Sequence, residues 1–377
     1  MQQTLRPYVT AGIAILGSGL IVANPVVMAP VSGADMRDVA LTASTTLPDL
    51  LAPWLAIYNQ AAENATTLTQ NFLLAPGVAL QQILANQTHF LQQIIDDPAN
   101  IPAVMQQMQS NLDAVLTGFT SFNASDATIT TVNYHTLSGN DLAELKIGHS
   151  GLYTLLPEFL PTDLWKTLQP VIDFLSSPLS GITIGLVGPL ISPEVALLDS
   201  IVAGDNPLQI LASPLDGFLN GATLNLDFLV PLISSLNLLP AGTAVTGLDF
   251  AFGGLLSTGS VEVGPYQVTD QAGQKVNVDP VGGSIFNSLG LTLKQSVLPA
   301  LGQLDIAGQG VGPIAALEGW DQAMGALLGS GWTGKGPVEV SPPWPGISWP
   351  TFDDGGAGAG AATDVLADLG GLMGFDH

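Results

Sequence analysis

The sequence lacks cysteine entirely and is poor in basic residues, with seven Lys and Arg among 377 residues. Without cysteine there are no disulfide bonds, thiolate metal sites or cysteine nucleophiles, so stability has to come from packing. Nucleic-acid phosphates are bound by clustered Lys and Arg, whereas here the basic residues are dispersed singly. The scarcity of basic residues argues against nucleic acid as a partner and disfavours anionic lipid surfaces. The absence of cysteine fits an exported bacterial protein.

Charge of either sign is also scarce. Asp, Glu, Lys and Arg make up 10% of the chain, against about 25% in a typical soluble domain. Most of these charges are acidic, which gives a formal net charge of −24, and the mean hydropathy is +0.41. An apolar chain whose charges share one sign suits a bilayer, a waxy cell envelope or a channel better than cytosol, and it attracts cations.

The N-terminus has the layout of a secretory signal peptide. Arg6 precedes an apolar run over residues 9–23, and small residues follow between 29 and 34, in the order of n-region, h-region and cleavage site. A permanent anchor helix is the alternative, because residues 11–29 have a borderline length for a membrane span. We expect a signal peptide at 1–34 and an exported protein of the cell envelope or outer membrane, or one that is secreted.

Three amphipathic helices are predicted early in the mature chain. Apolar residues repeat at helical spacing over 47–58, 80–95 and 101–119. Their polar faces are rich in Gln, because no basic residue lies between Arg37 and Lys146 to form Glu–Lys pairs. Such a face fits either a solvated uncharged surface or a surface turned toward an interface or a hydrated lumen, where amides avoid the desolvation cost of charge.

The middle of the chain is the most apolar. A short strand is predicted at 128–134 from its Thr, Ile and Val content, and a helical pattern follows over 157–175. Segments 179–198 and 228–256 each contain one charge and are long enough to span a membrane. Both contain internal Pro or Gly, which makes simple spanning helices doubtful and leaves broken membrane segments or an ordinary buried core.

The C-terminal part predicts a small β element and a tail. Alternation over 260–268 and 275–278 predicts a β-hairpin. Residues 342–350 contain two Trp among four Pro, which favours polyproline geometry, and the Gly/Ala-rich stretch 353–362 is typical of disorder.

The predicted fold class is therefore mainly α with a small β element. It combines amphipathic N-terminal helices, a Gly/Pro-interrupted apolar middle region and a disordered C-terminal tail. We expect a signal peptide at 1–34, an amphipathic helical region with a possible short strand at 35–150, and an apolar, Pro/Gly-interrupted region at 151–259. A β-hairpin with a Gly-rich region is expected at 260–335, and a Pro/Trp-rich then Gly/Ala-rich tail at 336–377.

The sequence contains no enzyme signature. No His pair has the spacing of a zinc motif, so we expect neither a metal nor a cofactor. The stretch Gly148–Gly151 resembles part of a nucleophile elbow, but Leu152 occupies the position of the required second Gly, and we interpret it as a turn. Residues 308–312 lack the context of a dinucleotide loop. The protein is predicted not to be an enzyme.

Acidic residues placed within apolar sequence are the remaining candidates for a functional site. Nine acids and no basic residue lie between Lys166 and Lys275, and rings of carboxylates in an oligomeric pore select cations. Asp227 and Asp249, with Glu194, are the candidate pore or selectivity carboxylates. The alternative is that these acids are ordinary loop and cap residues on a soluble surface.

Several stretches carry a family resemblance: Leu5–Gly12, Leu74–Val78 followed by Gln81-Gln82, Phe218–Asn225, Phe252–Ser257 and Gly282–Asn287. Together they resemble the GjpA-type outer-membrane porin family of actinobacteria with a mycolic-acid cell wall, including mycobacteria. The resemblance covers the chain to about residue 330. It implies an exported envelope protein that forms water-filled channels, as an oligomer, and it supplies no pore-lining residues.

We therefore expect a porin-like channel in a mycolate outer membrane that admits small hydrophilic solutes and prefers cations. The expected partners are membrane or envelope lipids, further copies of the chain and small cations. The alternative is a secreted, non-enzymatic structural or lipid-binding envelope protein, which would use the same apolar helices to hold acyl chains.

Overall fold

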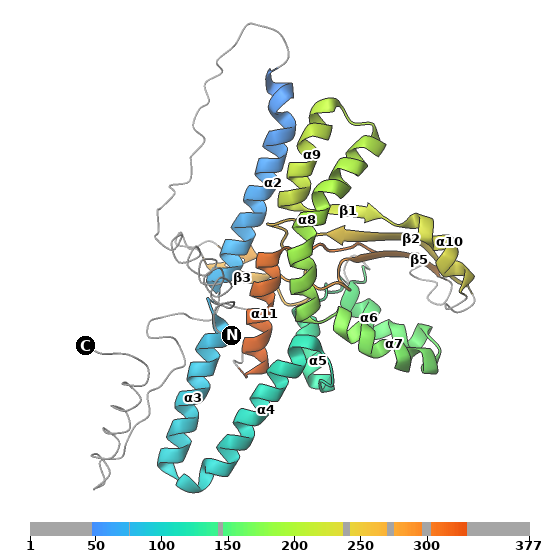
Figure 1. Ribbon diagram of the computed structural model, residues 1–377. Coiled ribbons are helices and arrows are strands. Elements are labelled where there is room, and N and C mark those ends of the chain that lie inside the picture. The colour runs from blue at the N-terminus through green and yellow to red at the C-terminus, as the bar shows by residue number, and fades with distance from the viewer. Residues whose placement is uncertain are drawn as a thin grey trace, which may run out of the picture. The chain divides into compact units, whose positions relative to one another are not determined.

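The computed structural model describes residues 47–74, 76–141, 146–236, 242–269, 275–295 and 303–329 (Figure 1). The chain divides into the units Met1–Asp49 and Leu50–His377, and nearly all described residues belong to the second. They are mainly helical with a small antiparallel sheet, which confirms the predicted fold class. The predicted signal peptide at 1–34 and tail at 336–377 lie outside the described residues.

The three predicted N-terminal helices are confirmed. Gly77, with φ +60°, separates the first two. Asp97 separates the next pair, and its Oδ1 accepts the backbone N–H of Ala99 at 2.9 Å. The elements are α2 (Leu47–Leu74), α3 (Val78–Asp96), the short η1 (Pro98–Asn100) and α4 (Ile101–Thr120).

The predicted strand at 128–134 is wrong, because this segment is the helix α5 (Asp126–Tyr134). Ser125 caps it by accepting the N–H of Thr128 at 3.2 Å, and such a cap stabilises a helix by about 1 kcal/mol. A Cβ on Gly118 of α4 would lie 3.3 Å from the Val132 side chain, so α5 packs closely against α4. Capping and packing outweigh the strand preference of the β-branched residues.

The helical pattern predicted over 157–175 is divided between α6 (His149–Phe159) and α7 (Thr162–Leu175). The interpretation of 148–151 as a turn is wrong, because Gly148 is the N-cap of α6 and His149 its first residue. The N–H of Ser150 donates to the carbonyl of Ser138 at 3.0 Å, which helps to satisfy this helix start.

The apolar segment 179–198 lies within one continuous helix, α8 (Pro178–Ala203), despite Pro189 and Pro193. The two prolines do not break the helix, so the alternative of a broken segment is wrong for 179–198. Close packing explains why the prolines are tolerated: a Cβ on Gly188 would overlap the carbonyl oxygen of Gly253, so α8 lies directly on neighbouring backbone. The next helix, α9 (Pro207–Asn220), packs extensively along α8.

The second apolar segment, 228–256, is not a single helix. Its first part forms η2 (Asp227–Leu229) and α10 (Val230–Ser235), and its last part forms the strand β2 (Thr243–Phe252). Because the segment is divided in this way, it provides no continuous span.

Four strands form an antiparallel sheet in the order β1-β2-β5-β6. A bulge in β2 lies between Val245 and Gly247. The predicted hairpin is confirmed as a separate two-stranded sheet, which begins at Tyr266 rather than at Ser260. The strands are β1 (Ala222–Asn225), β2, β3 (Tyr266–Thr269), β4 (Lys275–Val278), β5 (Leu289–Gln295) and β6 (Gln303–Ile306).

The last described helix, α11 (Pro313–Leu327), joins distant parts of the chain by contacting α3, α4, α5 and α8. Its Gln322 side chain donates to Asn71 Oδ1 on α2 at 2.5 Å, and Asn71 donates to the Asp279 carbonyl at 3.1 Å. Both side chains are buried. This polar link fixes α2, α11 and the loop after β4 to one another.

Candidate functional site

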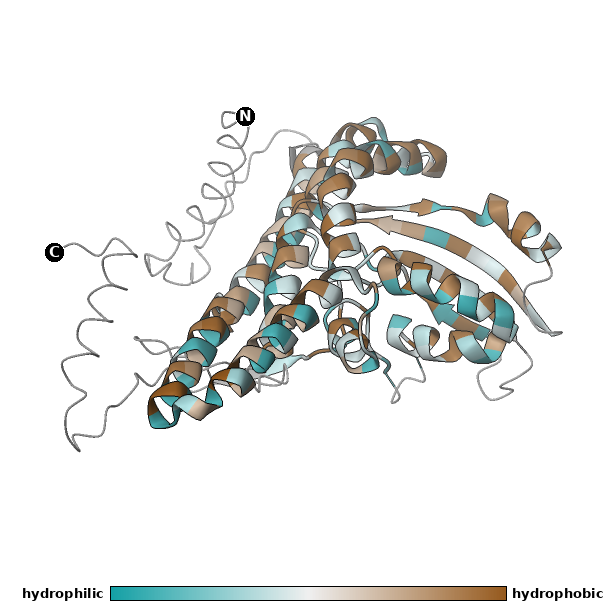
Figure 2. Ribbon diagram, turned by 60° about the horizontal axis from the view of Figure 1, so that its bottom comes forward, coloured by the Kyte–Doolittle hydropathy of each residue, from teal (hydrophilic) through white to brown (hydrophobic). Residues whose placement is uncertain are grey.

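Several apolar side chains of α8 and α9 are exposed. The ribbon coloured by hydropathy shows where hydrophobic residues lie along the helices (Figure 2). Val202 is 87% exposed and Leu190 is 73% exposed. Large contiguous apolar patches are uncommon on soluble monomers, whereas single exposed apolar residues are common. We define the α8–α9 apolar face by its exposed members, Leu186, Leu190, Leu198, Ile201, Val202, Leu211, Leu215 and Phe218.

The two sides of α8 differ in what they contact. Gly181, Gly185 and Gly188 face inward against backbone, and Ser192 is fully buried on the same side. The opposite side carries the exposed Leu residues of the α8–α9 apolar face. Among the described residues, α8 alone is long and apolar enough to cross a membrane. Core helices of soluble proteins share that length and composition, but their outer side is normally polar.

Asp249, one of the predicted carboxylates, lies on β2 opposite Asn225 and Gly290. A Cβ on Gly290 would overlap the carboxylate, and one on Gly308 would lie 2.9 Å from Oδ1, so the two glycines provide the space that this side chain occupies. Oδ1 is buried and has no hydrogen-bond partner. Burial, and then the charges of Asp305 and Asp227, raise the pKa of Asp249, while a hydrogen bond from the Gly308 backbone opposes that shift.

Asp227 is exposed, and its charge acts on the neighbouring Asp249. Its Oδ1 accepts the N–H of Leu248 at 2.9 Å, and its Oδ2 accepts the Asn225 amide at 3.1 Å. These two hydrogen bonds lower the pKa of Asp227, so it holds its negative charge more firmly than an ordinary Asp.

Asp305 completes this group, and the sequence interpretation missed it. It lies opposite Thr292 on β5, whose hydroxyl donates to Asp305 Oδ1 at 3.0 Å. The pairing register places Asp249, Thr292 and Asp305 on one face of the sheet, with Lys294 further along that face. We call Asp227, Asp249 and Asp305 the sheet carboxylates.

Glu194 does not join the sheet carboxylates. It lies exposed on α8, and the charges that act on Asp249 are those of Asp305 and Asp227. The structure therefore brings together two of the three predicted acids. Within the described residues, no group of three or more His, Asp or Glu side chains is placed to hold a metal ion.

Other acids from the same apolar stretch have local structural roles. Asp173 accepts the Tyr153 hydroxyl at 2.6 Å, and Asp205 accepts the Ser200 hydroxyl at 2.6 Å. Asp216 accepts the Asn220 amide at 2.7 Å. Only Asp205, which follows the end of α8, is a loop acid as the alternative interpretation has it; Asp173 is buried within α7, and Asp216 lies within α9.

A polar cavity of about 530 Å³ lies between α2 and the loops that flank the β3–β4 hairpin. It is lined by four acids from distant parts of the sequence, together with several amides. No sequence pattern links these acids, because they meet only in the folded chain. They are Glu63, Asp141, Glu262 and Asp279.

His149 and Ser138 form a buried pair that could be mistaken for a catalytic dyad. His149 Nε2 lies 2.7 Å from the carbonyl oxygen of Leu289 and must donate to it, so Nδ1 accepts the Ser138 hydroxyl at 2.8 Å. Burial lowers the pKa of His149, which favours the neutral ring, while the hydrogen bond to Leu289 opposes that shift. Both side chains are buried, so the pair connects the start of α6 to β5 and has no open side for a substrate.

Comparison with known protein families, curated proteins and solved structures gives no match to this chain.

Proposed function

We propose that the protein is a non-enzymatic cell-envelope protein that contacts lipid through its exposed helices, and that several copies form a cation-preferring channel for small hydrophilic solutes. The observation that carries this proposal is the α8–α9 apolar face. One side of α8 is buried against protein, and the other presents Leu and Val to the surroundings. Full burial of such a side chain stabilises by about 1.5–3 kcal/mol, so several together provide substantial affinity for lipid.

The sheet carboxylates support the channel part of the proposal. Asp249 and Asp305 on one face of the sheet, with Asp227 of η2 beside them, favour cations near that surface in a chain with a net charge of −24. Repetition of the surface around a symmetric oligomer would provide the ring of carboxylates that cation-selective pores use. The resemblance to the GjpA-type porin family supports the same assignment.

The second candidate function is lipid binding without conduction. The α8–α9 apolar face favours it equally, because contact with acyl chains requires neither an oligomer nor a pore. The two candidates share the lipid contact and differ only in whether ions cross the membrane.

Two measurements on the full chain test these functions. Flotation with phosphatidylcholine vesicles measures lipid binding, and a planar bilayer measures conductance. Stepwise conductance with a reversal potential that favours K⁺ over Cl⁻ supports the channel. Flotation with a silent bilayer supports lipid binding alone. Protein that neither floats nor conducts contradicts both candidates.

A matched pair of variants links the flotation result to the surface. Leu198 and Leu317 are exposed to similar degrees, at 57% and 46%, but only Leu198 belongs to the α8–α9 apolar face. Leu198→Gln should reduce vesicle binding about ten-fold, because it removes one buried Leu contact. Leu317→Gln on α11 should leave binding unchanged, and equal losses would show that the α8–α9 apolar face is not the contact.

A further inference from the structure

A row of five exposed side chains, spaced four residues apart, runs along α8. Its members are Leu186, Leu190, Glu194, Leu198 and Val202. Side chains at positions i and i+4 of a helix are neighbours, with Cβ atoms about 5–6 Å apart. The five therefore form one continuous row, which we call the α8 row. Its four apolar members belong to the α8–α9 apolar face, and its central member is a carboxylate.

Glu194 has no partner that would compensate its charge. Within the part of the chain that the structure describes, its side chain makes no hydrogen bond or ion pair. No basic residue lies between Lys166 and Lys275, so neither α8 nor α9 contains one. Water solvates an exposed carboxylate of this kind, whereas lipid packed on the α8 row would meet it uncompensated.

The other titratable groups near α8 lie off the row or have their own partners. Asp199 is exposed on α8 but falls outside the four-residue spacing. Asp205 accepts the Ser200 hydroxyl, and Asp216, the titratable group of α9, accepts the Asn220 amide. The remaining helices and strands that contact α8 carry Asp113, Asp163, Lys166, Asp173, Asp249, Glu318 and Asp321.

Lipid favours the protonated form of a carboxylate. Removing the ionised form from water costs far more than removing the neutral form, and ionisable side chains are rare on helix surfaces that face lipid. In water a Glu side chain releases its proton at about pH 4.3. A lipid-binding surface with a carboxylate at its centre therefore takes up a proton on binding at any pH well above that value.

We propose that the α8–α9 apolar face binds a zwitterionic lipid surface with Glu194 protonated, so that binding strengthens as the pH falls. It rests on the lipid contact of the proposed function, and it adds a lipid class and a regulation by protons. Charge identifies the lipid class: residues 178–220 contain four acids and no basic residue, so anionic headgroups are repelled. The bound state holds more protons than the free state, which by linkage makes binding tighter at lower pH.

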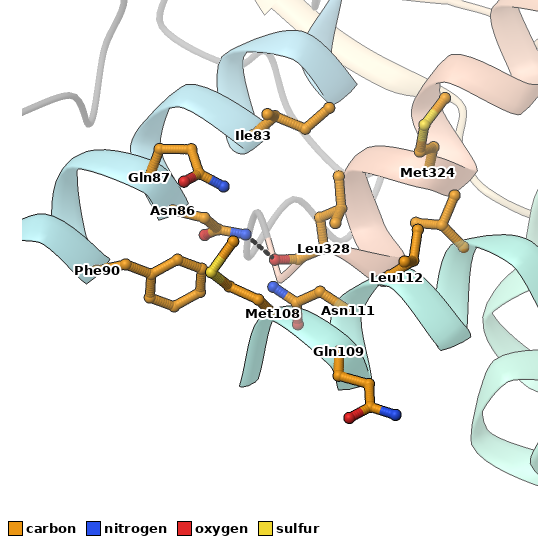
Figure 3. A pocket seen from close by; sticks show the side chains of 11 residues that line it. Ile83, Asn86, Gln87, Phe90, Met108, Gln109, Asn111, Leu112, Met324 and Leu328 are labelled. Atoms are coloured by element: carbon orange, nitrogen blue, oxygen red, sulfur yellow. Dashed lines mark hydrogen bonds between the residues drawn. The ribbon is translucent and has the colours of Figure 1, made fainter. Parts of the chain in front are cut away.

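The apolar groove between α3, α4 and the end of α11 provides a contrast within the same molecule (Figure 3). It measures about 430 Å³, and Phe90, Met108 and Leu112 are among its apolar lining residues. None of the residues that line it is titratable. Lipid bound in the groove would meet no group that changes its charge, so pH dependence distinguishes the two surfaces.

Flotation of the full chain with phosphatidylcholine vesicles at pH 5 and pH 8 tests the proposal. Wild-type protein should bind about ten-fold more tightly at pH 5; this factor corresponds to about 1.4 kcal/mol, a modest part of the cost of placing a charge in lipid. Glu194→Gln should bind at pH 8 about as tightly as the wild type does at pH 5. Glu194→Asp keeps a carboxylate and should keep the pH dependence. Circular dichroism at each pH verifies that all proteins are folded.

Two further variants serve as controls. Glu158→Gln makes the same chemical change at an exposed position of α6 and should retain the wild-type pH dependence, which separates the position of Glu194 from net charge. Met108→Gln alters the groove and should change neither the affinity nor its pH dependence.

Four outcomes would count against the proposal. Equal wild-type binding at pH 5 and pH 8 would overturn it and leave the lipid contact itself in place. A pH dependence that persists in Glu194→Gln would assign the proton to another acid. A loss of binding in Met108→Gln would move the lipid contact to the groove. Protein that floats at neither pH would contradict the lipid contact of the proposed function as well.

Discussion

The carboxylate of Asp321 on α11 accepts the backbone N–H of Val78, the first residue of α3, and also that of Ala79. Gly77, the N-cap of α3, offers no side-chain acceptor. A residue more than 240 positions later in the sequence therefore satisfies this helix start. The interaction also attaches α11 to the start of α3.

Asp321→Ala should lower the free energy of unfolding by about 1–3 kcal/mol, because it leaves two N–H groups at the α3 start without their acceptor. Asp321→Asn keeps an acceptor oxygen and should cost less. Urea denaturation at pH 7 measures both variants. Asp113→Ala on the exposed surface of α4 is the control and should change stability little; an equal loss in all three variants would contradict the capping role.

Stability should fall as the pH rises from 5 to 8, because two half-buried acids on α11 prefer to be protonated. Burial, and then the charge of Asp321, raise the pKa of Glu318 to about 8, and burial raises that of Asp321 to about 6. At a pH between a group's pKa in the unfolded state and its pKa in the folded state, the native state binds more protons than the unfolded state. A rise in pH therefore shifts the equilibrium toward unfolding. The stabilisation is complete at a pH below the unfolded-state pKa values of the two acids. It is lost as the pH rises through their folded-state pKa values.

Glu318→Gln tests this sign directly. One pKa unit corresponds to about 1.4 kcal/mol, so the variant should remove about 2 kcal/mol of the stability difference between pH 5 and pH 7. Denaturant unfolding at several pH values measures the slope. Glu194→Gln, an exposed change on α8, should keep the wild-type slope. Unaltered pH dependence in the Glu318 variant would refute the assignment.

The glycines of α8 should tolerate Ala unequally. A Cβ at Gly181 would overlap the carbonyl oxygen of Gly283, and one at Gly188 that of Gly253, whereas one at Gly185 would stand 3.0 Å from the Gly312 oxygen. Overpacking costs about 1–3 kcal/mol, so Gly181→Ala and Gly188→Ala should destabilise more than Gly185→Ala. Thermal unfolding ranks the variants, with the exposed Thr183→Ala as reference. Equal stability of all four would contradict close packing of α8 on the loops.

Local periodicity was sufficient to predict α2, α3, α4 and the β3–β4 hairpin, because each carries its own apolar pattern. The four-stranded sheet was not predicted, since β2 lies at the end of the long apolar run 228–256 and the composition of that run masks its alternation. The strand proposed at 128–134 failed for a related reason: residue preference was counted, whereas the Ser125 cap and packing on Gly118 decide the structure.

The candidate site was predictable only in part. Asp227 and Asp249 were identified because carboxylates are unusual in apolar sequence, and the sheet brings them together. Asp305 lies beyond the base-free stretch, and only strand pairing reveals its position. The acids of the polar cavity, such as Glu63 and Asp279, are far apart in sequence, so no spacing rule could connect them.

If the protein conducts, Asp249→Asn should reduce the preference for K⁺ over Cl⁻ by a few-fold, since one charge near the pathway is lost while the side-chain shape is kept. Asp113→Asn on α4 should leave the reversal potential unchanged. Burial and neighbouring acids raise the pKa of Asp249, so the wild-type cation preference should weaken on acidification before ordinary Asp residues protonate, and the Asn variant should lack that step. If the cation preference of Asp249→Asn changed with pH as it does in the wild type, the selectivity would depend on other residues. A carboxylate that sets the preference must also determine the pH at which the preference weakens.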